Sequence, residues 1–288
     1  MKNTIIENDA LAVLRGINKL FERILSGIVL VIITISSLWV GSWYLFGVCV
    51  FISLVGMMEL YRIIGIHKQL IGIIGYLSAI VYYICVYFNY QQYSLLILLA
   101  SLMLIMTAYV ISFPKYKTEE AIMVFFGICY IAVMLSYIYQ TRVIENGIYV
   151  VWIIFICSWG NDTFAYFTGV LFGKHKMAPK LSPKKSVEGA IGGVVGAAAL
   201  GAVYGYFVSE KLTMVSNPIF VFAVASATGA VLSIVGDLAA SAIKRNHNVK
   251  DYGKLIPGHG GILDRYDSVI FTAPVVFWVV YFLSGSTL

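Results

Sequence analysis

The chain alternates long apolar runs with short polar connections along almost its whole length. Crossing about 30 Å of hydrocarbon as a helix takes roughly 20 apolar residues, and nine runs come close to or exceed that length. The predicted segments are 25–38, 40–60, 70–88, 93–113, 120–139, 148–172, 188–209, 219–243 and 268–286. This pattern predicts an all-α, polytopic membrane protein with about nine transmembrane helices.

Composition agrees with this interpretation, because 60% of the 288 residues are hydrophobic and only 12% are charged, far from the usage of a soluble domain. Within the N-terminal segment 1–24, residues 10–24 place apolar side chains at helical spacing between charged ones, which predicts an amphipathic helix on the cytoplasmic membrane surface. A tail that is only partly helical is the alternative. We therefore divide the chain into this segment, a scaffold of N-terminal helices (25–147) that could supply dimer contacts, and a catalytic transmembrane domain with polar loops (148–288).

Basic residues gather in alternate connections. Of the 20 lysines and arginines, all but Arg142 and Lys211 fall on the side predicted to hold the N-terminus. Because cytoplasmic loops are enriched in Lys and Arg, the pattern predicts a cytoplasmic N-terminus and cytoplasmic polar loops in the cell membrane. Topology and anionic membrane lipids then account for the net charge of +6, and the chain carries no nucleic-acid motif.

Carboxylates occur deep inside apolar segments, where they are costly unless they face a polar cavity or a cation. Asn161 and Asp162 interrupt one segment, and Asp162 shares a helical face with Tyr166. Glu59 lies near the end of the predicted segment 40–60, and we interpret it as an i, i+3 partner of Arg62. The Asn161–Asp162 pair instead predicts a functional cavity, with a structural hydrogen bond between helices as the alternative.

The connection 173–189 holds five lysines, including Lys184 and Lys185, and it lacks the P-loop spacing. Lysines with backbone amides can bind a polyphosphate, although a basic loop that only sets topology would also explain them. Ser186 is placed to cap the following helix. That helix is rich in glycine and alanine, which predicts close helix packing.

The polar connection 241–268 carries most of the remaining charge. Before it, Asp237, Ser241 and Lys244 follow at i, i+4 and i+7 and share one helix face; after it, Asp264 and Asp267 are three residues apart. Carboxylates beside lysines suit phosphoryl or nucleotidyl transfer, in which a metal ion bridges phosphate oxygens. Oxygen ligands favour Mg²⁺, and the four cysteines lack metal-ligand spacing.

The run from Ser241 to Asp267, S-A-I-K-R-x(4)-K-D-x-G-x(3)-P-G-H-G-G-I-L-D-R-Y-D, resembles the signature of the phosphatidate cytidylyltransferases. The stretches 161–173 and 175–189 resemble the same family. The resemblance implies a dimeric nine-helix membrane enzyme that converts CTP and phosphatidate to CDP-diacylglycerol and pyrophosphate. It also implies a magnesium site, with K⁺ as a candidate second ion.

By that similarity Asp237 and Asp264 would hold the metal with Asp267 beside them, and Lys244 would join them in catalysis. The expected substrate-binding residues are Asn161, Asp162, Lys184, Lys185, Ser186, Ser241, Arg245, Lys250, Asp251, His259 and Arg265.

Two other functions are alternatives. A CTP-dependent kinase of a polyprenol-type lipid alcohol would use a related site but transfer the γ-phosphoryl group. An ion-coupled transporter would also need submerged carboxylates, but the chain shows no internal repeat and its polar residues gather on one side.

Overall fold

Helices form nearly all of the computed structural model, which describes residues 21, 24–213, 215–256, 258 and 260–284. Within these residues, eight helices are long and apolar enough to cross a membrane, and a shorter apolar helix, Ile24–Val40, precedes them. The predicted all-α architecture with nine apolar helices is therefore confirmed, and the chain is an integral membrane protein. Most of the predicted surface segment 1–24 lies outside the described residues, and the cytoplasmic orientation stays a prediction.

Several of the spans are built from more than one helical piece. The first three after Ile24–Val40 are α2 (Ser42–Ile64), α3 (Leu70–Tyr87) and α4 (Ser94–Ile111), the last preceded by the short helix η1 (Gln91–Tyr93). Next come α5 (Thr118–Gly127), η2 (Ile128–Val133) and α6 (Met134–Val143) as one span, and α7 (Gly147–Phe155), η3 (Ile156–Gly160) and α8 (Asn161–Phe172) as another. The last three are α9 (Val187–Val208, extended by η4, Ser209–Lys211), α10 (Pro218–Asn246) and α11 (Leu263–Ser284).

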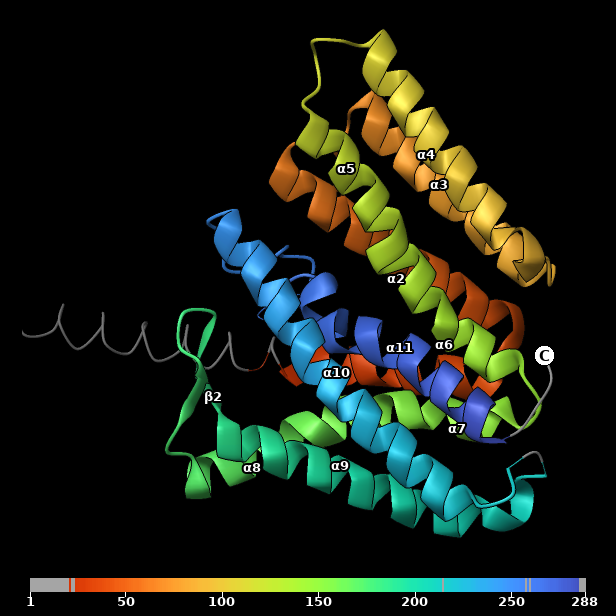
Figure 1. Cartoon of the computed structure of the whole chain (residues 1–288), viewed down its shortest axis with the longest axis vertical. Helices are drawn as coiled ribbons and strands as arrows, with labels where there is room; N and C mark the ends of the chain where they lie inside the picture. Colours follow the sequence, from red (N-terminus) through yellow and green to blue (C-terminus); the bar gives the residue numbers. More distant parts are fainter. Residues whose placement is uncertain (1–20, 22–23, 214, 257, 259, 285–288) are drawn as a thin grey trace, which may run out of the picture.

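α10 and α11 lie together near the middle of the helix bundle (Figure 1). α10 packs against both α9 and α11, and α8 lies along α9. In Figure 1, α3 and α4 lie side by side at the top, and α7, α8 and α9 form the lower part. The sequence segments that carry the candidate site residues therefore meet around α10.

Two spans contain a π-helical piece, η2 and η3, which apolar periodicity did not predict. A π-turn holds an extra residue and often occurs at functional sites. η3 comes directly before Asn161, whose side chain is buried against Gly193 of α9. The π-turn therefore sets which way the first polar residues of α8 face.

Glycines let α9 approach its neighbours, as its composition predicted. A Cβ on Gly196 would collide with the ring of Phe164 in α8, and a Cβ on Gly205 would lie 2.6 Å from the backbone oxygen of Pro218 at the start of α10. Small residues replace side-chain packing with close backbone contact.

The basic connection 173–189 forms a β-hairpin, where the sequence predicted a loop. β1 (Lys176–Ala178) pairs antiparallel with β2 (Ser182–Ser186), with Lys176 opposite Ser186. The predicted cap is confirmed, since the Ser186 hydroxyl accepts a 3.1 Å hydrogen bond from the Gly189 N–H at the start of α9. The hairpin thus holds the lysines of β2 in a fixed register above α8 and α9.

A sharp turn joins the helix Ile24–Val40 to α2. Gly41 has a φ of 65°, a left-handed conformation that glycine adopts at little cost. Arg142, at the end of α6, donates from Nε to the Leu38 carbonyl at 2.8 Å and from Nη2 to the Trp39 carbonyl at 3.3 Å. These bonds satisfy carbonyls that the helix end leaves free.

Candidate functional site

A pocket with charged residues in its lining lies where α8, the hairpin, α9 and α10 meet. Its volume is about 360 Å³, and α8 contributes Asn161 and Asp162 to its lining, while β2 contributes Lys184, Lys185 and Ser186. These five residues were predicted as substrate-binding from two separate stretches, and the structure brings them to one pocket. We call it the hairpin pocket.

An ion pair between Lys185 and Asp237 joins the hairpin to α10. Both side chains are about three-quarters buried, with exposed fractions of 25% and 29%. Asp162 lies close enough to Lys185 and Asp237 for their charges to act on it, and Asp267 stands in the same relation to Asp237 and Lys244. Carboxylates from α8, α10 and α11 and lysines from β2 and α10 therefore form one electrostatic cluster.

Asp264 lies next to this cluster in the first turn of α11 and is 8% exposed. Its Oδ1 accepts a 2.8 Å hydrogen bond from Lys244 Nζ, so the two residues form a buried ion pair. Its Oδ2 accepts bonds of 2.9 Å from the backbone N–H groups of Tyr252 and Gly261. One carboxylate thus holds together α10, the connection after it and α11.

Tyr252, which the sequence analysis did not single out, supports this arrangement. Its hydroxyl donates a 3.1 Å bond to the Ala240 carbonyl of α10, and Lys244 Nζ lies 5.3 Å from its ring centroid, within cation–π range. Burial raises the pKa of Tyr252 above its ordinary value, so the hydroxyl stays protonated at neutral pH and keeps donating. Lys244 is therefore held from two sides.

Glu59 of α2 has a different role from the predicted ion pair with Arg62. It is fully buried, and its two carboxylate oxygens accept hydrogen bonds from Ile262 N–H at 3.1 Å and Leu263 N–H at 2.9 Å. Amides at a helix start lack partners within the helix, and the positive end of the dipole favours a carboxylate there. Glu59 thus fixes the position of α11 and with it Asp264.

The backbone around Glu59 leaves room for little but glycine. A Cβ on Gly253 or on Gly261 would collide with the Glu59 carboxylate. Arg62 Nη2 donates a 3.3 Å bond to the Tyr252 carbonyl, and its charge also acts on Glu59. The signal for this contact was a carboxylate within an apolar segment, and no motif in the chain identifies the backbone groups that the carboxylate binds.

Other predicted residues lie apart from the hairpin pocket. Lys250 and Asp251 line a second pocket of about 480 Å³ together with Arg62 and Lys254. Ser241 is half-buried on α10 between Asp237 and Lys244, and Arg245 is exposed near the end of that helix. Arg265 is exposed and its charge acts on Asp162. His259 lies outside the described residues.

The donor set suits a hard cation. Within the described ranges, no three carboxylate, histidine or cysteine side chains form a ready metal cluster. Mg²⁺ in phosphate-transferring sites is commonly held by one or two carboxylates and completed by substrate phosphates and water. Asp237 and Asp267, which lie within electrostatic range of each other, fit that pattern, and the cysteines are free thiols within the apolar spans.

Fold and site together define a polytopic membrane protein in which carboxylates and lysines, the groups that handle metal-bound phosphates, converge beside one end of α10. The sequence profile of the cytidylyltransferase family matches residues 21–283, and the chain belongs to that family. Enzymes of this kind generally need a divalent metal ion.

Proteins named phosphatidate cytidylyltransferase are among its relatives. The one from Staphylococcus haemolyticus is 30% identical over 261 residues, covering 88% of this chain and 96% of the relative. The one from Bacillus subtilis is 28% identical, covering 91% and 98%. The one from Thermotoga maritima is 37% identical over 173 residues, covering 59% of this chain and 62% of the relative, so that match spans less than two thirds of its length.

Proposed function

We infer that this chain is a nucleotidyltransferase that transfers the cytidylyl group of CTP to phosphatidate, forming CDP-diacylglycerol for phospholipid synthesis and releasing pyrophosphate. Membership of the cytidylyltransferase family over most of the chain and the named relatives support this function. The observation that carries it is that Asp162 and Lys185 line one pocket of a membrane-spanning bundle, where Lys185 forms an ion pair with Asp237 of α10. A soluble nucleotide and a membrane lipid can both reach such a place.

The reaction is one in-line displacement. A phosphate oxygen of phosphatidate attacks the α-phosphorus of CTP, and the bond from that phosphorus to the oxygen bridging to the β-phosphate breaks with its electron pair. Pyrophosphate leaves with the added charge, which Lys185 and Lys244 are placed to stabilise once phosphate oxygens replace Asp237 and Asp264 as their partners. The exposed Arg245 and Arg265 extend the cationic surface, and no covalent enzyme intermediate is needed.

We propose Mg²⁺ as the divalent ion and K⁺ as a candidate second ion. Asp237 and Asp267 would hold Mg²⁺, which supplies charge neutralisation on the phosphate oxygens when bound. Asp264 is the third proposed ligand, and its Oδ1 can reach a metal only in competition with Lys244. In the cell we place the protein as a homodimer in the cytoplasmic membrane, with the site facing the cytoplasm.

Label transfer from CTP tests the function directly. The purified protein, incubated in detergent with phosphatidate and CTP labelled at the α-phosphate, should move the label into a lipid product and release unlabelled pyrophosphate. A lipid-alcohol kinase would instead leave the label in CDP. A transporter would form no lipid product without a sealed compartment.

Removal of divalent ions should stop the reaction, because the carboxylates at the site would then repel the phosphates of CTP. We expect EDTA in excess over Mg²⁺ to lower the rate by at least about 10³-fold and added Mg²⁺ to restore it. Product formation is measured by thin-layer chromatography. Undiminished turnover in excess chelator would contradict the proposed metal requirement.

A further inference from the structure

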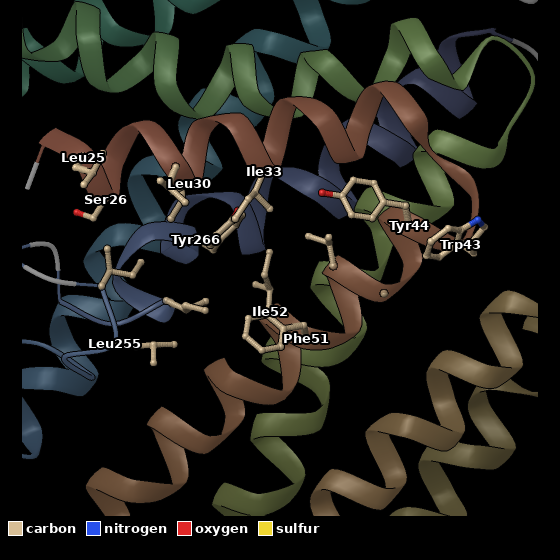
Figure 2. Close-up of a pocket in the computed structure, with 15 residues that line it drawn as sticks. Leu25, Ser26, Leu30, Ile33, Trp43, Tyr44, Phe51, Ile52, Leu255 and Tyr266 are labelled. Atoms are coloured by element: carbon tan, nitrogen blue, oxygen red, sulfur yellow. The ribbon is translucent and has the colours of Figure 1, made fainter.

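An apolar groove separates the helix Ile24–Val40 from α2. Its volume is about 610 Å³, within the range of ligand pockets. Figure 2 shows Leu25 and Ile33 on one wall, Phe51 and Ile52 on the other, and Leu255 at one end. Trp43 lies at the opposite end, where the two helices meet at Gly41. The groove is thus a wedge that widens toward the connection between α10 and α11.

The groove offers a ligand almost no polar contact. Of the three hydroxyl groups among its lining residues, those of Tyr44 and Tyr266 are already in hydrogen bonds, with Ser36 at 3.3 Å and Thr34 at 3.0 Å. Leu25 and Phe51 remain 51% and 58% exposed although they line the groove. In a membrane-spanning protein such walls face hydrocarbon, so the occupant must be apolar and flexible enough to fill a wedge.

The groove shares structural elements with the candidate site. Ile262 and Tyr266 line it, and they lie two residues before and two residues after Asp264 on α11. Leu255 and Ile256 line its wide end and follow Tyr252, whose N–H bonds Asp264. The apolar groove and a carboxylate of the site are therefore lined by residues of the same helical turn.

We propose that this groove binds the acyl chains of the lipid substrate, phosphatidate, and so determines chain-length preference. The proposal rests on the proposed function, which requires a two-chain lipid to bring its phosphate to the start of α11. A lipid whose chains fill the wedge has its glycerol at the wide end, beside the connection that carries Leu255. The groove then positions the phosphate through the part of the substrate that does not react.

Gly47 allows a test that leaves the site untouched. It lines the groove in the second turn of α2, and a Cβ placed on it would meet nothing within 4 Å. Gly47→Leu should therefore fill the groove without a clash, and leucine favours helix over glycine. Ala100→Leu is the matched control, because Ala100 is an exposed position of α4 away from the groove.

The measurement is steady-state kinetics with dioleoyl and dihexanoyl phosphatidate in detergent micelles. Gly47→Leu should raise the apparent KM for the dioleoyl lipid about tenfold or more and change that for the dihexanoyl lipid by less than about twofold. The KM of Gly47→Leu for CTP should stay at the wild-type value. The KM values of Ala100→Leu for both lipids should also stay at the wild-type values. A phosphatidate probe with a diazirine in mid-chain should cross-link to α2 or Ile24–Val40 in the wild type and much less in Gly47→Leu.

Three results would overturn the proposal. Unchanged constants for both lipids would show that the chains lie elsewhere, and an equal effect on both lipids would indicate a bound structural lipid. A changed oligomeric state without chain-length dependence would indicate that a second copy fills the groove. Failure of the proposed function looks different, because the wild type would then convert neither lipid while the cross-link would still report whether the groove holds an acyl chain.

Discussion

Replacing Asp264 with asparagine should lower kcat for CDP-diacylglycerol formation by about 10³-fold or more. Asparagine is neutral, so Lys244 loses the negative partner that lies 2.8 Å away. Its NH₂ group must also face either that ammonium or the N–H groups of Tyr252 and Gly261. The change is measured by steady-state kinetics of the purified variant.

Stability must be measured alongside, since losing one partner of a buried ion pair costs about 3–5 kcal/mol. The buried thiols of Cys49 and Cys157 make this practical, because a thiol-reactive dye labels them only on unfolding. Glu119→Gln, a change at an exposed carboxylate at the start of α5, is the control. Full activity of a folded Asp264→Asn protein would remove Asp264 from the site.

A magnesium titration separates the two roles of Asp264. If it binds the metal, the Mg²⁺ concentration for half-maximal rate should rise in Asp264→Asn and stay unchanged in Lys244→Met. If it only positions Lys244, both variants should lose rate at an unchanged Mg²⁺ requirement.

Replacing Glu59 with glutamine should lower kcat by about 10²-fold, the scale expected when a reacting group is displaced by about 1 Å. Both Glu59 oxygens accept backbone N–H groups at the start of α11, and the glutamine NH₂ would set a donor against one of them. Because Glu59 is not placed to touch CTP, the KM for CTP should change less than about twofold, within the range of surface substitutions. Glu59 is therefore a positioning residue. Steady-state kinetics of the purified variant measures kcat and the KM for CTP separately.

The same contact can be disturbed from the other side. Gly261→Ala would push a methyl group into the Glu59 carboxylate, so it should reproduce the kcat loss while Glu59 itself is intact. Glu119→Gln again serves as the control. A Glu59→Gln protein with wild-type kcat, or with a raised KM for CTP and unchanged kcat, would contradict the positioning role.

Much of the site could be predicted because its residues lie on helices with clear spacing. The shared face of Asp237, Ser241 and Lys244 follows from 3.6 residues per turn, and the cost of a charge within an apolar segment predicted that Asp162 lines a cavity. The Ser186 cap was predicted from residue type and position alone. Such rules act within one element, and the structure confirms the cap and the nine apolar helices.

Contacts between distant elements could not be predicted in this way. Glu59 meets Ile262 across 203 positions of sequence, and helical spacing carries no information on such a pair. The hairpin depends on the pairing of Lys176 with Ser186. The lysines of this connection are equally compatible with an irregular loop, so residue type did not predict the strands. The division of the basic residues between two pockets likewise depends on the path of the backbone after α10, which Tyr252 and Asp264 determine together.

The bond from Glu59 to the start of α11 limits how the chain could be recombined with its relatives. A chimera could take residues 148–288 from one protein and the preceding helices from another. It would keep every recognisable motif, yet the carboxylate at position 59 would come from the second protein. Unless the second protein also has a glutamate at this position, the N–H groups of Ile262 and Leu263 at the start of α11 lose their acceptor. The helices that carry no chemistry would then decide whether the transplanted half works.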